Sequence, residues 1–293
     1  MDANSWQMET NTRESLYQRA MIVRAKKRLG QNFLVEPKIL QLVCDTTNAK
    51  PGDTVVEIGP GLGFLTECLV KTGARVYAIE LDQDMADRLE GLAKEFPNLT
   101  VVRRDFLHFD LGELNAEKIK VVGNVPYQIT TPIISRVLGE IDAPSSWLPR
   151  IESLTMMVQY ELARRISAKA GGKDYGQITI LADYYSEASF ISKVGSEHFV
   201  PRPNVESAII KLVKRDKPKV SVRNAKVLRQ LVANGFKERR KMLRNNLAFT
   251  HLSQEEIHNI LLGLGISPAA RAETINLEKL AKLADIIDEH LNN

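Results

Sequence analysis

Hydrophobic and polar positions change in regular blocks between residues 54 and 123. Short apolar runs rich in Val and Ile alternate with longer segments whose apolar residues recur at helical spacing. The runs predict strands and the longer segments predict helices. The expected strands are 54–58, 75–79, 99–103 and 119–123, and the expected helices are 62–71, 83–95 and a shorter one after Asp105. Such alternation is typical of a parallel sheet with helices on both faces.

The pattern on either side of this block is less regular. Helices are expected at 15–24, 37–45, 130–138, 160–169 and 177–185, with a turn-rich linker at 142–149 and a strand at 154–158. Two further strands, 188–194 and 206–213, are expected to pair antiparallel at the sheet edge. Residues 223–293 are helical with no strand signal, including a capping box at Ser253 and Glu256 and a final helix at 275–291. The C-terminal part is therefore expected to be a small helical domain.

A glycine-rich turn, Gly59-Pro60-Gly61-Leu62-Gly63, follows the first strand of the block and precedes a helix. Glycines permit a tight turn, and amides at a helix N-terminus point at whatever lies over that turn. Seventeen residues after Gly63 the second strand ends in Glu80, a carboxylate suited to a ribose diol. The combination predicts a cofactor that contains adenosine. A nicotinamide dehydrogenase is disfavoured, because its Gly-x-Gly-x-x-Gly spacing is not met here.

Polar residues end four successive strands of the block, at Glu57 and Gly59, Glu80, Asp105 and Asn124. In such folds ligands bind at the carboxyl ends of the strands, so these residues are expected to converge on one edge. Asp105 has two interpretations, as a helix N-cap or as an acceptor for an adenine amino group.

Asn124-Val125-Pro126-Tyr127 closes the fourth strand and has a specific chemical use. The Asn124 side-chain oxygen and a backbone carbonyl of the turn can both accept hydrogen bonds from an exocyclic NH2 group. That arrangement makes the nitrogen tetrahedral and frees its lone pair for attack, while the Tyr127 ring offers a stacking face. Further along, Phe199 is a candidate second face for a flipped base, and Arg202 is a candidate phosphate contact. A lone aromatic such as Phe199 is also commonly a core residue.

A basic run, Lys26-Lys27-Arg28, leads into Leu29-Gly30-Gln31-Asn32-Phe33-Leu34. This segment is either a loop that caps the sheet or a lid over the cofactor with Asn32 and Leu34 in contact with it.

The charge distribution points to a polyanion. The net charge is only +4, but residues 211–250 hold 13 Lys and Arg against 2 Asp and Glu, whereas residues 39–210 hold 17 against 23. The densest run is 237–246, in which Lys237, Lys241 and Arg244 would share one face of a helix. Residues 1–38 are also basic, with 7 against 4. An acidic body with two basic segments suggests a bound polyanion. The alternative is a solvated charged helix, but the size of the cluster favours nucleic acid.

Other features place the chain in a reducing compartment. The N-terminus lacks an apolar signal core, and no apolar run is long enough for a membrane span. The two cysteines, Cys44 and Cys68, have no disulfide or zinc spacing, so no metal is expected.

Six motifs occur together in an order that closely resembles the bacterial small-subunit ribosomal RNA adenine dimethyltransferases (the KsgA/RsmA type). The resemblance covers residues 24–291, and the motifs are 27–34, 57–63, 124–127, 199–207, 239–246 and 271–274. The turn reads Asn-Val-Pro-Tyr where Asn-Leu-Pro-Tyr is commoner, a change that leaves the chemistry intact. Residues 1–23 precede the family's usual start.

The resemblance implies a Rossmann-like class I methyltransferase domain at 24–215, with a mostly parallel seven-stranded sheet and an antiparallel edge. It implies an N-terminal extension at 1–23 and a small all-α RNA-binding domain at 216–293. The methyl donor would be S-adenosylmethionine, and the product N6-dimethylated adenosine at two adjacent positions in the 3′-terminal hairpin loop of 16S rRNA. The substrate would be a pre-assembled 30S particle, and the enzyme a cytoplasmic monomer.

Site residues are carried over by position. The cofactor would contact Asn32, Leu34, Gly59, Gly61, Glu80, Asp105 and Asn124, and the target adenine would contact Asn124, Tyr127 and Phe199. The expected RNA contacts are based on charge and not on the resemblance, and they are Arg202, Lys237, Arg239, Arg240, Lys241 and Arg244.

Two alternatives remain open at this point. One is a large-subunit rRNA adenine methyltransferase of the macrolide-resistance type, which would share the glycine turn and the Asn-x-Pro-Tyr turn. The segment at 239–246 favours the small-subunit family instead. The other alternative is an assembly factor whose main role is to bind immature subunits, although the intact Asn124–Tyr127 turn argues for catalysis.

Overall fold

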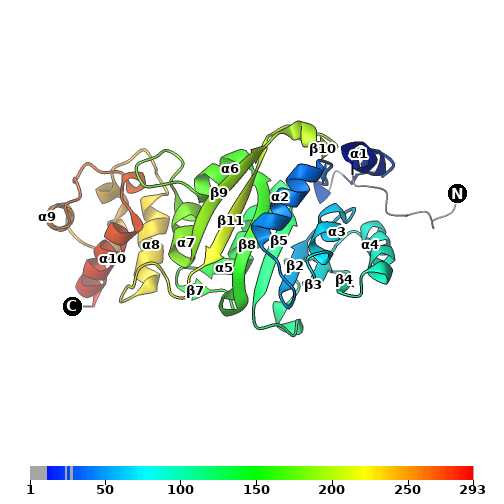
Figure 1. Cartoon of the computed structure of the whole chain (residues 1–293). Coiled ribbons are helices and arrows are strands. Elements are labelled where there is room, and N and C mark those ends of the chain that lie inside the picture. The colour runs from blue at the N-terminus through cyan, green and yellow to red at the C-terminus, as the bar shows by residue number, and fades with distance from the viewer. Residues whose placement is uncertain (1–11, 24, 27–28, 293) are drawn as a thin grey trace. The chain divides into compact units, whose positions relative to one another are not determined.

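The computed structural model describes residues 12–23, 25–26 and 29–292 (Figure 1). Residues 1–11 of the expected N-terminal extension lie outside this range. The chain divides into two compact units. The first contains residues up to Ile134, Pro149–Ala163 and Phe190–Lys211, and the second contains Ser135–Leu148, Arg164–Ser189 and residues from Leu212 onward.

A seven-stranded sheet with the order β4-β3-β2-β5-β8-β11-β9 forms the centre of the fold. The pairs β4–β3, β3–β2, β2–β5 and β5–β8 are parallel. The strands are β2 (Thr54–Ile58), β3 (Arg75–Ile79), β4 (Leu99–Val102), β5 (Ile119–Asn124), β8 (Ile151–Gln159), β9 (Ser186–Val194) and β11 (Ser207–Lys214). All five residues of β2 are buried, as expected for a central strand covered on both faces. The Rossmann-like fold class is confirmed, and every predicted strand exists.

The helices of the first unit connect these strands. They are α2 (Pro37–Thr47), α3 (Phe64–Val70) and α4 (Gln83–Glu95), followed by α5 (Thr130–Leu138) and α6 (Tyr160–Ile166), which continue into the second unit. Pro37 begins α2 because a first-turn residue needs no backbone donor. Asp82 caps α4 by accepting a hydrogen bond from the Asp84 amide. A two-stranded ribbon, β1 (Phe33–Leu34) with β10 (Phe199–Val200), also lies in this unit.

The strand order reverses between β2 and β5. The chain moves outward from β2 to β3 and β4, then returns to β5 on the other side of β2. Such a reversal separates the connecting loops and opens a crevice at the carboxyl ends. Gly123 lets the two strands approach closely, since a Cβ there would lie 2.7 Å from the Ile58 carbonyl oxygen. The residues that follow β2 and β5 therefore border the same crevice.

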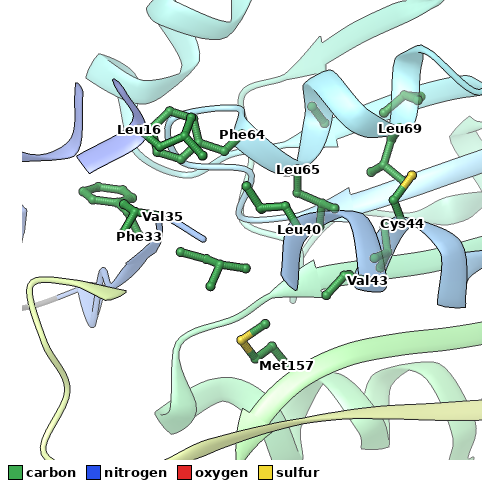
Figure 2. Close-up of a cluster of buried hydrophobic side chains, with 14 of the residues drawn as sticks. Leu16, Phe33, Val35, Leu40, Val43, Cys44, Phe64, Leu65, Leu69 and Met157 are labelled. Atoms are coloured by element: carbon green, nitrogen blue, oxygen red, sulfur yellow. The ribbon is translucent and has the colours of Figure 1, made fainter. Parts of the chain in front are cut away.

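The N-terminal helix α1 (Arg13–Met21) belongs to the core of the first unit. Its Leu16 and Ala20 are buried in one hydrophobic cluster with Phe33 and Phe64, and Figure 2 shows Leu16 beside Phe64. Arg19 lies over the Phe64 ring, 4.7 Å from its centroid. The described part of the extension is thus an integral helix, close to the helix expected at 15–24.

The second unit is mainly helical. It contains α7 (Gln177–Tyr185), α8 (Ala225–Gly235), α9 (Gln254–Gly263) and α10 (Leu277–Leu291), and α10 packs against the other three. The Ser253–Glu256 capping box is present, with each side chain accepting from the backbone amide of the other residue. Within the residues that the structure describes, no helix is long and apolar enough to cross a membrane.

The expected linker at 142–149 is more ordered than the sequence suggested. A small hairpin pairs β6 (Gly139–Glu140) with β7 (Ala143–Pro144). Trp147, which follows the hairpin, is buried, and the Arg136 guanidinium lies 4.3 Å from the centroid of its ring system. Turn residues marked this segment correctly as irregular, but the pattern did not indicate that one aromatic side chain would anchor it.

Two predicted helices were wrong. The chain after Asp105 forms a turn and then a short 3-10 helix, η2 (Leu111–Glu113). The basic run 237–246 is also not an α-helix, because α8 ends at Gly235, residues 236–240 form turns, and only Leu243–Asn246 is a 3-10 helix (η6). The Asn246 amide closes this turn by donating to the Gly235 carbonyl at 3.2 Å. Closely spaced like charges on one helical face would also repel each other.

Candidate active site

A cavity lies at the carboxyl ends of β2, β3, β4 and β5, where the strand order reverses. The loop before β1 contributes to its lining as well. All seven residues predicted to contact a cofactor line it, together with Tyr127: Asn32, Leu34, Gly59, Gly61, Glu80, Asp105 and Asn124. The structure therefore brings the predicted cofactor set together in one place.

The glycine turn has the backbone conformation that its sequence predicted. Gly59, Gly61 and Gly63 all have positive φ, at 60°, 56° and 79°. A Cβ at Gly61 would lie 3.1 Å from the Phe33 ring, so the turn also fits closely against β1. At Gly59, by contrast, a Cβ would meet nothing within 4 Å, so the backbone faces open space on the cavity side. This is the close approach to a ligand that a glycine turn permits.

Glu80 is held by two backbone amides. One carboxylate oxygen accepts from Gly61 at 3.0 Å and the other from Asp82 at 2.8 Å. Burial raises the pKa of Glu80, although these two hydrogen bonds oppose the rise. Each oxygen keeps a second lone pair, so the carboxylate can still accept from a diol in the cavity.

Glu57 is a feature that the sequence indicated only as a polar strand end. It lies within the buried strand β2, lines the cavity and accepts a hydrogen bond from the Thr66 hydroxyl at 2.6 Å. Burial raises the pKa of Glu57 to about 8. A carboxyl group in an apolar strand was the available signal, because it needs a partner or a proton.

Asp105 is not a helix N-cap, because only a turn follows it, but its side chain caps that turn and borders the cavity. One of its oxygens accepts from the Leu107 amide at 2.9 Å, and the other lies 3.1 Å from His108 Nδ1. The side chain is partly exposed. A role toward an adenine amino group is compatible with this position and stays a prediction.

Asn124, the last residue of β5, is oriented by the loop before β1. Its Nδ2 donates to the Asn32 carbonyl at 3.0 Å. Because a carbonyl oxygen can only accept, the amide nitrogen must face Asn32, and Oδ1 is left to accept from another group. Asn32 itself is fixed by a hydrogen bond from its side chain to the Gly30 carbonyl at 3.0 Å.

Tyr127 begins the short helix η3 (Tyr127–Ile129) beside Asn124. Its hydroxyl lies 2.7 Å from the Ser207 hydroxyl at the start of β11, and Ser207 is fully buried. Burial raises the pKa of Tyr127, so the phenol is neutral at physiological pH. The contact fixes the ring by its polar tip and leaves its faces for packing.

The predicted partner of Tyr127, Phe199, is placed differently. It is 3% exposed, pairs with Leu34 in the β1–β10 ribbon and belongs to the core cluster. It is not among the residues that line the cavity. In this conformation Phe199 is a core residue, and its role as a stacking face stays a prediction.

The residues predicted to contact RNA differ in their exposure and in whether they form ion pairs or hydrogen bonds within the protein. Lys237 and Arg240 are exposed, Arg244 is partly buried, and Lys241 forms an exposed ion pair with Glu238 at 2.6 Å. Arg202 is exposed and donates to the Ser196 hydroxyl at 2.8 Å.

The Arg239 side chain is bound by other groups of the second unit. Its guanidinium donates to the Lys173 and Tyr175 carbonyls at 2.5 and 3.0 Å and pairs with Glu273 at 2.9 Å. It therefore holds the loop before α7 against the C-terminal helices, a role that the sequence did not indicate.

The fold and this site define a methyltransferase of the Rossmann-like class. The structure is similar to that of the 23S rRNA methyltransferase ErmE, with a TM-score of 0.68 and 27% identity over 89% of this chain and all of that chain. It also shares its fold with a dimethyladenosine transferase from Plasmodium falciparum, with a TM-score of 0.65 and 24% identity over 88% of each chain.

Sequence comparison narrows the class to one family. The model for ribosomal RNA adenine dimethylase matches residues 22–289, and the chain belongs to this family. A ribosomal RNA small subunit methyltransferase A from Clostridium botulinum is 41% identical over 89% of this chain and 93% of its own length. A protein of the same name from Geobacillus kaustophilus is 39% identical over 89% of this chain and 90% of its own. The family and the enzyme class inferred from the motifs are thus confirmed.

Proposed function

We propose that the protein dimethylates N6 of two adjacent adenosines in the 3′-terminal hairpin loop of small-subunit rRNA, during biogenesis of the small ribosomal subunit. The main support for the proposal is the hydrogen bond from Asn124 Nδ2 to the Asn32 carbonyl. It fixes the side-chain amide so that Oδ1 is left to accept a hydrogen bond from an amino group. The relatives named ribosomal RNA small subunit methyltransferase A support the choice of RNA.

The cavity suits S-adenosylmethionine. Glu80 offers a held carboxylate for the ribose diol, Asp105 an acceptor for the adenine amino group, and Gly59 and Gly61 an approachable backbone. Leu34 and Asn32 border the same cavity. When bound, this cofactor supplies a methyl group on a sulfonium, which leaves by in-line displacement.

The protein's own residues position and activate the target nitrogen. Asn124 Oδ1 and a backbone carbonyl of the 124–127 turn accept the two N6 hydrogens, which exposes the lone pair. Tyr127, held by Ser207, supports the ring of the base. The target base must leave its stack to reach this cavity, as in other base-modifying enzymes. Positioning of this kind can lower the barrier by several kcal/mol, on the order of the effective-molarity effects measured for oriented reactants.

No strong general base is required, because the methylated N6 becomes acidic and loses its proton to water or to a carbonyl acceptor. Four transfers per RNA require that the cofactor be exchanged and that the cavity admit one methyl group already present.

The basic turn of residues 237–246 is proposed to hold the RNA phosphates, with Arg202 as a further contact on the first unit. The substrate is a pre-assembled 30S particle, and the enzyme acts on it as a cytoplasmic monomer. Non-specific attraction to phosphate would supply affinity, while the 124–127 turn would select the base.

The large-subunit alternative is less well supported. The 23S enzyme ErmE is 27% identical to this chain, whereas the small-subunit relatives reach 41%. An assembly role through binding alone does not need the arrangement of Asn124 and Tyr127, although binding and catalysis can coexist.

One experiment tests the function. Labelled S-adenosylmethionine is incubated with the protein and either small-subunit particles or large-subunit RNA, and the RNA is digested to nucleosides. We expect N6,N6-dimethyladenosine in the small-subunit sample. Label that appears only in the large-subunit sample would instead support the macrolide-resistance type of activity.

A further inference from the structure

Asp82 lies on the loop between β3 and α4, and its buried side chain joins three segments of the chain. Its carboxylate accepts from Lys26 Nζ at 2.6 Å, from Gln31 Nε2 at 2.8 Å and from the Asp84 amide at 3.1 Å. The side chain is fully inaccessible to solvent, whereas Lys26 is about one-third exposed. Burial alone would raise the pKa of Asp82, but the hydrogen bonds from Lys26 and Gln31 outweigh it and hold the pKa below its usual range.

Lys26 and Gln31 also bind each other. The Lys26 amide donates to Gln31 Oε1 at 2.8 Å, while Lys26 Nζ makes a second ion pair, with the exposed Asp84 at 2.7 Å. Gln31 thus accepts from Lys26 with one end of its side chain and donates to Asp82 with the other. Lys26, Gln31 and Asp82 form a closed network, which we call the Asp82 network.

The Asp82 network contacts both the glycine-turn side of the cavity, through Glu80, and the side that contains Asn124, through Gln31. Through its own amide, Asp82 donates to Glu80, whose other oxygen accepts from Gly61 of the glycine turn. Gln31 lines the cavity and immediately precedes Asn32, whose carbonyl receives Asn124 Nδ2. Asp82 is therefore joined to Glu80 by one hydrogen bond of its amide. Its carboxylate is joined to Asn32 by one hydrogen bond to Gln31 and the peptide bond that follows.

We propose that Asp82 is a positioning residue, which with Lys26 and Gln31 fixes the loop 29–32 before β1 in the lining of the cavity and so positions Glu80 and Asn124 relative to each other. The inference builds on the proposed function, because it assumes that the cavity receives the methyl donor. None of the three side chains reacts with the target adenine. Their effect passes through the backbone of Asn32 and through the Glu80 carboxylate.

The test uses the full chain and binding of S-adenosylhomocysteine measured by calorimetry, with no RNA present. Asp82→Asn keeps a good helix N-cap, so α4 is preserved, but it places an amide where two donors converge. Lys26→Met removes the cation and keeps the aliphatic stem. Asp84→Asn is the matched control, because Asp84 also pairs with Lys26 but touches neither Gln31 nor Glu80.

We expect Asp82→Asn and Lys26→Met each to raise the Kd for S-adenosylhomocysteine about tenfold, the size of one lost charged hydrogen bond. The double variant should bind no worse than Asp82→Asn alone, since both changes break one interaction. Lys26→Arg should restore most of the affinity, and Asp84→Asn should stay within about twofold of the unmodified protein. With small-subunit particles, Asp82→Asn should also lower kcat, because Asn124 loses its fixed partner.

An unchanged Kd in Asp82→Asn, in protein with unchanged thermal unfolding, would overturn the proposal. An equal loss in Asp84→Asn would also overturn it, since general charge removal would then explain the effect. The proposed function fails separately, if the unmodified protein itself does not bind S-adenosylhomocysteine or does not methylate small-subunit particles.

Discussion

The carboxyl edge of the sheet and the basic turn at 237–246 handle charge in opposite ways. At the sheet edge, Glu80 and Asp82 are bound by amides or by Lys26, and Glu57 is buried against Thr66. In the basic turn, Lys237 and Arg240 are exposed to solvent. The first region is arranged before any ligand arrives, whereas the second presents charge that a polyanion can neutralise. Buried hydrogen bonds therefore orient the groups of the candidate site, whereas exposed cations attract the polyanion.

The largest expected effect is a loss of activity when Asn124, at the carboxyl edge of the sheet, is replaced. Asn124→Ala removes the acceptor for N6, and loss of one such positioned polar group lowers kcat by about 10²–10³-fold. The measurement is methyl transfer to small-subunit particles under saturating cofactor. Particle binding should survive, so a variant that loses binding and turnover in parallel would place Asn124 in the interface instead.

Glu57→Gln tests the buried carboxyl group in the same region. With its pKa raised to about 8, Glu57 is protonated in the folded state over a range in which the unfolded chain has released the proton. The contribution of Glu57 to the free energy of unfolding is therefore greatest below about pH 4.5, and it falls as the pH rises to about 8. The neutral amide avoids this loss, so the variant should gain up to about 1.4 kcal/mol over the unmodified protein for each pH unit in that window.

Thermal unfolding between pH 5 and pH 8 measures the difference between the two proteins. The gap should be smallest at pH 5 and should widen steadily towards pH 8. A constant gap would mean that the carboxyl group does not change protonation on folding.

Neutralising the basic turn tests the exposed region. The triple change of Lys237, Arg240 and Lys241 to Gln should weaken particle binding about tenfold at low salt and flatten its dependence on salt. A matched control changes Lys38, Lys94 and Lys118 to Gln, which are three exposed lysines outside the turn. If the control lowers the salt slope equally, net charge and not this turn governs the attraction.

The smallest effect separates two adjacent arginines. Arg239→Ala should destabilise the fold by about 1 kcal/mol, because it removes two carbonyl contacts and a partly exposed ion pair. Arg240→Ala should leave thermal unfolding unchanged and weaken RNA binding. Equal effects of the two changes on stability would contradict the structural role given to the contacts of Arg239.

Local signals in the sequence predicted the strand ends well. Gly59, Glu80, Asp105 and Asn124 were expected at one edge because parallel strands deliver their carboxyl ends together, and all four line the cavity. The helix at Gln83–Glu95 has the predicted bounds. These features depend on periodicity and turn chemistry, and both are determined by residues that are close together in the sequence.

Long-range contacts were the part that sequence reasoning missed. The Lys26–Asp82 pair joins residues 56 positions apart, and Arg239 reaches Lys173 across 66 positions. No local pattern encodes such partners. The basic run at 237–246 was misjudged for the same reason, since its charge spacing resembled a helix while contacts of Asn246 and Leu243 shape it as a turn.

The buried Trp147 gives this molecule a spectroscopic handle. The chain has only two tryptophans, Trp6 and Trp147, and the second lies 3% exposed beneath Arg136 in the second unit. In a Trp6→Phe protein all indole emission would come from that one site. A red shift on denaturation would then report when the second unit opens, while loss of S-adenosylhomocysteine binding reports on the first, so the order in which the two units unfold becomes measurable in one sample.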